Sequence, residues 1–496
     1  MSKGKRYILT ITLLSFTVLI YSRINYTGFS YLLDLYRSIF IEICDVLSPD
    51  ETDFKIVDLN RCKKYTYTYG KLPEGFIHFG HFLLFRAPRD TPIRDLARQS
   101  IIYTHYYRSY QLEESIREYN GLDSGLLGRG DTVFIPYSLP PYLPEVKKSI
   151  KPRIIFSRGI YYTGNSIGSV RILRRIGQIK KAGINTVVFD AKDVTGIVNY
   201  FSHVPAVIEF DTHRKRSIDN IDKLIRYLKS REIFIIARIA VFRDHLLYKA
   251  SPQLAIQSRR GGLWNRNENE LWVDPTNRTV QDYNIELAIE LAEKGVDEIQ
   301  FDYIRFPTLG NLSDAAYAYD FGRISKEETI TRFLKRAYHE IARRNTLLSI
   351  DIFGVVAWSK PIDIRKTGQR IETLSRYCDV ISPMLYPSHF NDDFEGFTNP
   401  GDNPYHFIFH GCKRVQKLSR RAVRPWLQAF KWRVSNYDET YIMDQVYAAI
   451  DAGAFGYLFW NASNNYDIVF SALRKMKGAK RRAHNHKTEK VSRESH

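Results

Sequence analysis

The chain has 496 residues, of which 44% are hydrophobic and 26% are charged. This balance is typical of globular proteins and excludes a disordered, collagenous or polytopic membrane chain. Its four cysteines are too few for a disulfide scaffold, and none lies in a CxxC pair, so a thiolate zinc site is not expected. The length suggests roughly two to four domains, or one large barrel with an accessory module.

The formal net charge of +19 is compatible with a nucleic-acid partner. Much of this charge is local, however, because residues 474–496 contain nine Lys and Arg against two Glu. A short polar segment of this kind has too little apolar surface to fold. We therefore expect a disordered basic tail over residues 471–496 and no nucleic-acid partner. The sequence does not indicate an oligomeric state.

The N-terminus has the pattern of an export signal. Lys3, Lys5 and Arg6 precede the uncharged run 7–21, which is the layout of a secretory signal or signal anchor. The run is shorter than the ~20 residues of a full transmembrane helix. Because no clear A-x-A cleavage site follows, we predict an uncleaved anchor within residues 1–28, with a cleaved signal peptide as the alternative. Either one predicts an exported protein, and the anchor would hold it on the membrane, facing the periplasm or cell exterior.

Residues 29–84 form a predicted connecting region. Within it, residues 29–47 are amphipathic and could lie on a membrane surface. Cys44 and Cys62 could pair in an oxidising compartment. The sequence alone leaves that pairing open.

Residues 85–136 predict a small module with the order strand, helix, helix, strand. The segments that carry a resemblance to LysM modules are 90–91, 96–97, 120–122 and 130–136. Arg89 departs from the glycine usual in that family, and the middle of the module is expanded. LysM modules bind glycans that contain N-acetylglucosamine, so the resemblance implies attachment to such a polymer. The alternative is a spacer domain, followed by a Pro-rich linker over residues 137–152.

Between residues 153 and 470, apolar strand-like runs alternate with helical patterns such as 170–181 and 280–293. This alternation predicts a (β/α)8 TIM-type barrel with insertions. An open doubly wound sheet would require a Gly-rich phosphate turn after its first strand, and no GxGxxG motif occurs there. The predicted strands are 153–157, 185–190, 233–241, 298–302, 347–353, 379–385, 425–429 and 456–460.

The C-terminal ends of barrel strands carry the chemistry in this architecture, and side chains alternate between the inside and the outside. This alternation predicts that polar and aromatic side chains converge on one mouth. Each has a structural alternative: Asp190 could pair with Lys192, Asp351 could brace a cation, and Arg238 could be a counter-ion. The predicted inward residues are Asp190, Lys192, Arg238, Gln300, Asp302, Asp351, Tyr386, Gln428 and Trp460.

Several carboxyl groups at one mouth permit glycoside hydrolysis, which needs two of them about 5–5.5 Å apart if retaining and about 6.5–9.5 Å apart if inverting. One must keep a raised pKa and act as an acid. We predict Asp302 as the nucleophile or base, Asp351 as the preferred acid and Asp190 as the second choice. Sugar-binding side chains would be Lys192, Arg238, Gln300, Arg305 and Gln428, with Trp264, Trp272, Tyr386 and Trp460 as stacking surfaces. No HxH or HExxH pattern predicts a metal, and no cofactor is expected.

The strings DEIQFDYIRFP at 297–307 and NTVVFDAKDVTG at 185–196 resemble the family called domain of unknown function 4015 (DUF4015). Residues 271–275 and 382–389 also resemble segments of this family. The resemblance implies a glycoside hydrolase barrel with a carboxylate at the end of the fourth strand, which here is Asp302. We therefore expect hydrolysis of an envelope or extracellular polysaccharide. The alternative is a glycan-binding or envelope-tethering protein that uses the same mouth without turnover.

Overall fold

The computed structural model describes residues 74–79, 82–104, 106, 109–136, 154–169, 171–265, 270–319 and 324–477. The predicted anchor, Cys44, Cys62, the Pro-rich linker and most of the basic tail lie outside these residues. Among the described residues, no helix combines the length and the apolar character needed to cross a bilayer.

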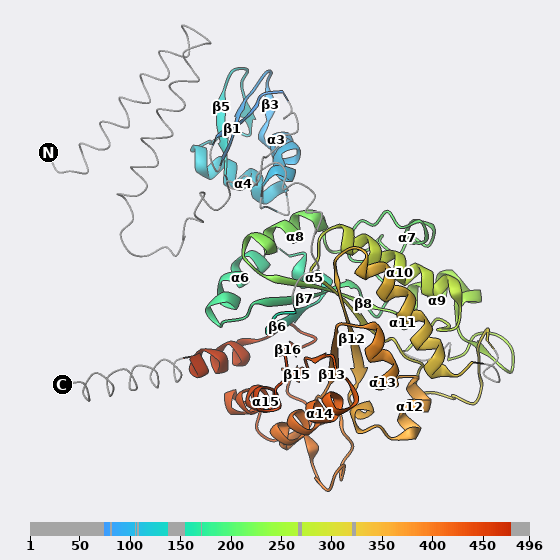
Figure 1. Ribbon diagram of the computed structural model, residues 1–496. Helices are drawn as coiled ribbons and strands as arrows, with labels where there is room; N and C mark the ends of the chain where they lie inside the picture. The colour runs from blue at the N-terminus through green and yellow to red at the C-terminus, as the bar shows by residue number, and fades with distance from the viewer. Residues whose placement is uncertain are drawn as a thin grey trace, which may run out of the picture. The chain divides into compact units, whose positions relative to one another are not determined.

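The small module has its own sheet and core (Figure 1). Strand β2 (Phe82–Arg86) pairs antiparallel with β1 (Phe76–Phe79) and with β5 (Thr132–Ile135). Between β2 and β5 the chain forms α3 (Ile93–Ser100) and α4 (Ser109–Asn120). The order strand, helix, helix, strand is as predicted, and β1 is an addition within the predicted connecting region. Whether the module is LysM-like and binds glycan stays a prediction.

Eight parallel strands close into a barrel, because each strand pairs with the next and the last, β16, pairs with the first, β6. The prediction of a (β/α)8 barrel is confirmed. The strands are β6 (Ser157–Tyr162), β7 (Thr186–Lys192), β8 (Phe234–Ala240), β10 (Glu298–Asp302), β12 (Leu347–Phe353), β13 (Val380–Met384), β15 (Trp426–Gln428) and β16 (Gly456–Trp460).

Helices surround the barrel in Figure 1. Several begin at a side chain that caps the first turn: Asn220 accepts from the amide of Lys223, and Ser325 accepts from the amide of Glu328. The longer helices of the ring are α6 (Arg171–Lys181), α8 (Ile221–Ser230), α10 (Arg278–Glu293), α11 (Lys326–Ala342), α14 (Pro404–Leu418) and α15 (Glu439–Asp451). The predicted helical patterns 170–181 and 280–293 correspond to α6 and α10 within a few residues, whereas α14 was not predicted.

The predicted first strand, 153–157, is wrong. The strand runs over Ser157–Tyr162, where Gly159 pairs with Thr186 on β7 and with Leu458 on β16. A Cβ at Gly159 would lie 2.2 Å from Leu458 Cδ2, so the close packing of these strands needs glycine. Glycine weakens a strand pattern, which is why the apolar run before it looked more strand-like. The shift places Tyr161 inside the barrel.

Alternation along the strands separates two apolar clusters. Outward side chains pack against the helices in the main core. Inward side chains form a second, smaller cluster of Tyr161, Val188, Ile236, Tyr386, Trp426 and Leu458. This inner cluster fills the middle of the barrel, and charged side chains lie at both of its ends.

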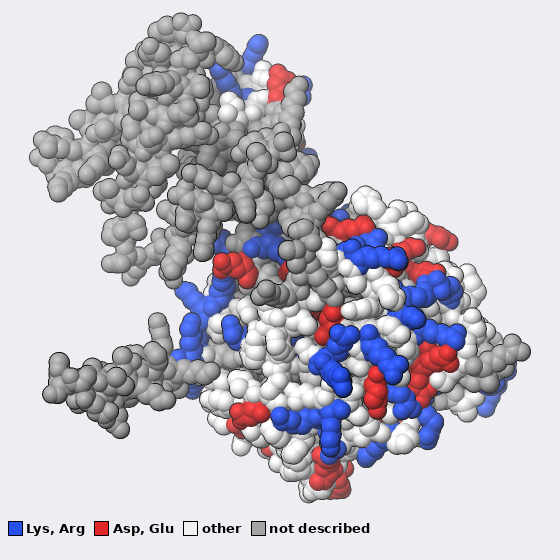
Figure 2. Space-filling model, viewed as in Figure 1, with Lys and Arg blue, Asp and Glu red and all other residues white. Residues whose placement is uncertain are grey.

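Basic and acidic side chains are interspersed on the face of the barrel seen in Figure 2. The described part of the chain also contains ion pairs such as Arg344 with Glu293 (2.8 Å) and Lys294 with Asp222 (3.3 Å). Its positive charge is therefore partly compensated. The predicted absence of a nucleic-acid partner stays a prediction.

Candidate active site

Four charged side chains come together at the C-terminal end of the barrel. Asp190 lies on β7, Arg238 on β8, Asp302 on β10 and Asp351 on β12, and all four are buried. Asp190 is in register with Arg238. The pairing of Phe301 with Ile350 brings Asp302 level with Asp351 on the neighbouring strand. The structure thus unites the three predicted carboxyl groups and the predicted cation.

Arg238 lies between two of the carboxylates. Its Nη1 donates to Asp190 Oδ1, while Nε and Nη2 donate to Asp302 Oδ2 at 3.1 and 2.5 Å. Burial opposes the charge of Arg238, but Asp190 and Asp302 outweigh it and hold the guanidinium pKa well above its usual value. The charge-assisted bonds orient the Asp302 carboxyl group.

Asp190 is fully engaged by its neighbours. Besides Arg238, it accepts a hydrogen bond of 2.5 Å from the Tyr161 hydroxyl through Oδ2. Burial raises the pKa of Asp190 to about 6, although Arg238 and the Tyr161 hydrogen bond oppose the rise. Because both oxygens are occupied, Asp190 is arranged to position Arg238. The sequence analysis missed Tyr161, because the misplaced first strand left it outside the barrel.

Asp351 is the least satisfied of the three carboxyl groups. Trp426 Nε1 donates to Oδ1 at 2.8 Å, whereas the buried Oδ2 has no hydrogen-bond partner among the described residues. Burial, followed by the nearby charge of Asp302, raises the pKa of Asp351 well above the usual range of a carboxyl group. Asp351 is thus favoured as a protonated acid beside Asp302.

The residue that follows Asp302 has an uncommon backbone. Tyr303 has a φ of +53°, a left-handed conformation that is rare for a bulky residue, and its amide donates to Asp302 Oδ1 at 2.6 Å. Its hydroxyl accepts from Arg243 Nη1 at 3.1 Å, and its ring packs 5.8 Å from that of Trp272. Such strained positions cluster at functional sites. Here the conformation aims an amide at the candidate nucleophile.

Aromatic rings form the other side of the mouth. The ring of Trp460 lies 5.7 Å from Tyr386 and 5.3 Å from Phe430, and His389 lies 5.2 Å from Trp432. Trp432 is 49% exposed, so its face is open to a ligand. Tyr386 and Trp460 were predicted, whereas His389, Phe430 and Trp432 were missed. Their positions just after the strands β13 and β15 were the available signal.

The predicted inward orientation of Lys192 is wrong. The register of β7 shifts after Asp190, so that Lys192 pairs with the outward-facing Ile239. Its Nζ donates to Ala240 O at 2.7 Å and to Asn284 Oδ1 on α10 at 3.1 Å, and it forms an ion pair with Asp244 (2.7 Å). A bulge adds one residue and reverses the alternation beyond it. Lys192 therefore braces the outside of the barrel.

The predicted stacking surfaces Trp264 and Trp272 are not available to a sugar, because each is 1% exposed. Trp264 Nε1 donates to Asn311 O at 2.8 Å, which ties together the loops that follow β8 and β10. The ring of Trp272 packs under the Arg305 guanidinium at 4.9 Å. Both indole rings stabilise the insertion after β8.

Three further predicted binding residues are buried and engaged with protein atoms. Gln300 lies below Asp302 and donates to Ser382 Oγ at 3.3 Å. Arg305 donates to Phe306 O at 3.1 Å, and burial lowers its pKa. Gln428 joins two loops, since Oε1 accepts from the Ser388 amide and Nε2 donates to Phe430 O. Their roles toward a sugar stay predictions.

Within the described residues, no group of three or more His, Cys, Asp or Glu side chains is arranged to hold a metal ion. The Arg238 guanidinium lies between Asp190 and Asp302 instead. What the arrangement can do is favour a proton on Asp351 beside Asp302, whose oxygens are held by Arg238 and the Tyr303 amide, and this suits general acid catalysis beside a nucleophile or base.

Solved structures similar to the chain include three that differ in identity and coverage. A hypothetical protein from Ruminiclostridium thermocellum ATCC 27405 is 38% identical over 39% of this chain and 96% of its own, with a TM-score of 0.35. The PgaB (BpsB) glycoside hydrolase domain from Bordetella bronchiseptica is 15% identical, covering 64% and 98%, with a TM-score of 0.48. The Bacillus cereus spore cortex-lytic enzyme SleL is 10% identical, covering 79% and 87%, with a TM-score of 0.40.

No curated protein matches the chain. The model of DUF4015, described as a putative glycosyl hydrolase domain, matches residues 159–466, which is more than half of the chain and nearly all of the barrel. This match includes every strand of the barrel from Gly159 onward and all four charged residues of the mouth. The chain therefore belongs to the DUF4015 family of glycosyl hydrolase-like barrels.

Proposed function

We propose that this protein is a glycoside hydrolase that cleaves a polysaccharide with Asp302 and Asp351. The observation that carries the proposal is that the two carboxyl groups have different surroundings. Asp302 is held by a guanidinium and a backbone amide, whereas Asp351 is buried with a raised pKa and one unpaired oxygen. Two carboxyl groups with opposite protonation states are what glycoside hydrolysis requires.

The register of the two residues is compatible with a retaining mechanism, which we include in the proposal. Asp302 and Asp351 are level on neighbouring strands, whose backbones lie about 4.8 Å apart, and retaining enzymes hold their two carboxyl groups close together, about 5–5.5 Å apart. Asp302 would attack the anomeric carbon while Asp351 donates its proton to the departing glycosidic oxygen. Water would then attack the glycosyl ester and give a proton to Asp351, which regenerates Asp302 as a carboxylate.

Substrate class and location are further parts of this proposal. The aromatic side of the mouth suits the apolar faces of sugar rings, and the LysM-like pattern of residues 85–136 favours a polymer that contains N-acetylglucosamine. The basic and apolar N-terminus favours an exported protein, anchored through residues 1–28 and facing the periplasm or cell exterior. The substrate would then be an envelope or extracellular polysaccharide.

Reducing-end release by the full chain in mild detergent tests this function. The glycan panel includes N-acetylglucosamine polymers and peptidoglycan, and the variants are Asp302→Asn and Asp351→Asn. The exposed Asp393→Asn provides a matched control, because it makes the same chemical change at a side chain outside the cluster of Asp190, Arg238, Asp302 and Asp351. We expect release by wild type and the control, and its loss in both mouth variants.

A glycan-binding protein without turnover is the second candidate. It is favoured by the low exposure of the carboxyl groups, since Asp351 is only 1% exposed. Glycan binding by wild type without release of reducing ends would support this candidate. Release of reducing ends that persists in Asp302→Asn would support the assignment as an enzyme but reject Asp302 as its nucleophile.

A further inference from the structure

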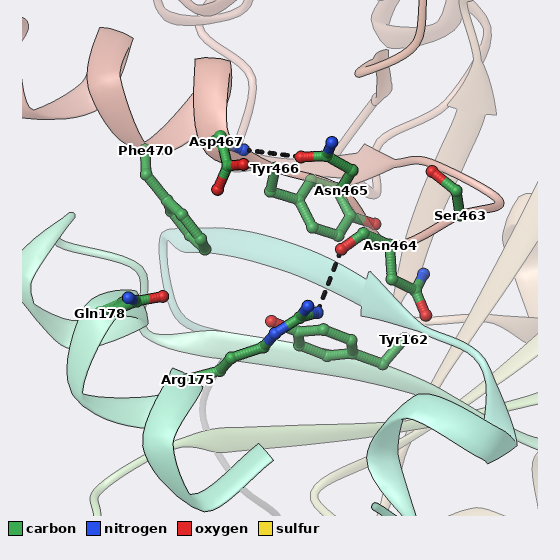
Figure 3. Close-up of a pocket in the computed structure, with 9 residues that line it drawn as sticks. All are labelled: Tyr162, Arg175, Gln178, Ser463, Asn464, Asn465, Tyr466, Asp467 and Phe470. Carbon is green, nitrogen blue, oxygen red and sulfur yellow. Dashed lines mark hydrogen bonds between the residues drawn. The ribbon is translucent and has the colours of Figure 1, made fainter. Parts of the chain in front are cut away.

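We propose that a pocket on the outer face of the barrel wall is a second saccharide-binding site, separate from the mouth. The cavity has a volume of about 480 Å³ and lies between α6, the end of β6, the loop after β16 and the helix over residues 467–477 (Figure 3). Ligand pockets usually span about 300–1,000 Å³. The lining residues are Tyr162, Arg175, Gln178, Ser463, Asn464, Asn465, Tyr466, Asp467 and Phe470.

Aromatic rings make up one part of the pocket lining. The Tyr162 ring lies 6.0 Å from that of Tyr466, which in turn lies 6.4 Å from that of Phe470. All three side chains are held in the main core and are at most 6% exposed. These rings therefore form a rigid apolar floor beneath the cavity and do not offer an open stacking face.

Planar polar side chains make up the rest of the lining. Figure 3 shows Arg175 and Gln178 on α6, with Asn465 and Asp467 on the opposite wall. Arg175 donates to the carbonyl oxygen of Asn464 at 3.2 Å and forms no salt bridge with a described carboxylate. Guanidinium, amide and carboxylate groups can each bond two adjacent hydroxyls. Such groups around a cavity with an apolar floor fit a neutral or N-acetylated sugar better than a purely apolar ligand.

The pocket and the mouth share one segment of backbone. Tyr161 points into the barrel and bonds Asp190, while the next residue, Tyr162, lines the pocket. The Tyr466 hydroxyl donates to Tyr161 O at 2.7 Å, and Asn464 Nδ2 donates to the same oxygen at 3.3 Å. A polysaccharide held in the pocket would thus be tethered beside the mouth. This role rests on the proposed function and deepens it, because tethering raises the local concentration of substrate.

Binding to the full chain carrying Asp302→Asn tests the pocket without turnover. The probes are hexasaccharides of N-acetylglucosamine, glucose, xylose and galactose, and affinity is measured by calorimetry. Gln178→Trp should fill the pocket and Arg175→Ala should remove its cation, whereas the exposed Lys181→Ala on the same helix serves as the control. We expect either pocket variant to weaken binding of at least one probe by roughly tenfold or more, as loss of a second attachment point does.

Kinetics separate tethering from catalysis. With the native Asp302, Gln178→Trp should raise KM for the polymer and leave turnover of a disaccharide substrate unchanged. If both pocket variants bind every probe as the Lys181→Ala control does, the second site is rejected. If the pocket variants weaken binding while wild type hydrolyses no glycan, the proposed function fails and the pocket survives.

Discussion

The two ends of the barrel interior each bury an arginine with carboxylates, and strand β10 contributes to both. At the N-terminal end, Glu298 pairs with Arg424, whose Nη1 also donates to Ser157 Oγ at 3.0 Å. Both members of the pair are at most 1% exposed. At the C-terminal end, the single guanidinium of Arg238 faces Asp190, Asp302 and Asp351.

The difference between the ends is one of charge balance. Glu298 and Arg424 form an ion pair of one carboxylate with one guanidinium. The three carboxyl groups around Arg238 carry more negative charge than one cation can compensate, and Asp351 is favoured in its protonated form. Burial is common to both ends. Burial is the larger cause of the raised pKa of Asp351, and the surplus of carboxyl groups adds to it at this end of the barrel, which distinguishes the end that is suited to acid–base chemistry.

The largest expected effect is that of Asp302→Asn. Because this change removes the proposed nucleophile while leaving an amide of similar size, we expect kcat to fall by at least about 10³-fold. Initial rates of reducing-end release measure the loss, with Asp393→Asn as the control. Residual activity above one-tenth of wild type would show that the carboxyl groups at the C-terminal end of the barrel do not act through Asp302.

Asp351→Asn should have the next largest effect. Loss of a general acid lowers the rate about 10²–10⁴-fold. Since the pKa of Asp351 is raised, its acid form is present at neutral pH and is lost as the pH rises through that value. The wild-type rate should therefore fall at alkaline pH, whereas the variant should lack this fall. An alkaline limb that persists unchanged in Asp351→Asn would assign the acid to another residue.

Stability should respond in opposite ways at the two ends. Glu298→Gln leaves Arg424 buried without its counter-ion and should cost about 3–5 kcal/mol in free energy of unfolding. Asp351→Asn should instead stabilise the fold at neutral pH. The raised pKa of Asp351 contributes stability below the pKa of the unfolded chain, and that stability is lost as the pH rises through the folded value. Urea unfolding across a pH series measures both variants.

The smallest effect is expected for Tyr161→Phe. The change removes the 2.5 Å hydrogen bond to Asp190 but leaves the Arg238 contact. A lost hydrogen bond to a charged group is worth about 1.5–3 kcal/mol. Only part of this energy should destabilise the transition state relative to the free enzyme and substrate. We expect a loss of kcat/KM of several-fold, with KM little changed. A loss as large as that of Asp302→Asn would make Tyr161 itself catalytic.

Much of the barrel could be predicted from the sequence, because buried parallel strands are apolar and recur between helices. The strands 298–302, 347–353 and 456–460 were predicted to the residue. The same alternation placed Asp190, Arg238, Asp302 and Asp351 at one mouth. These four residues lie on strands whose period of two is unbroken up to the residue concerned.

What could not be predicted depends on contacts between distant segments. The bulge that turns Lys192 outward has no local sequence mark, and Tyr161 was missed because Gly159 interrupts its strand. The burial of Trp272 depends on the insertion after β8 folding over it. The pairing of charges could not be predicted either. No sequence pattern indicates that Arg424 pairs with Glu298, or that Asp190 accepts hydrogen bonds from Arg238 and Tyr161.

The central claim is that Asp351 holds a proton beside Asp302, and infrared difference spectroscopy tests it without a substrate. At about pH 8, where a carboxyl group with the pKa of Asp190, about 6, is ionised, a protonated carboxyl band should remain in wild type. This band should be absent from Asp351→Asn and present in Asp190→Asn. Absence of the band from wild type, or its survival in Asp351→Asn, would contradict the account.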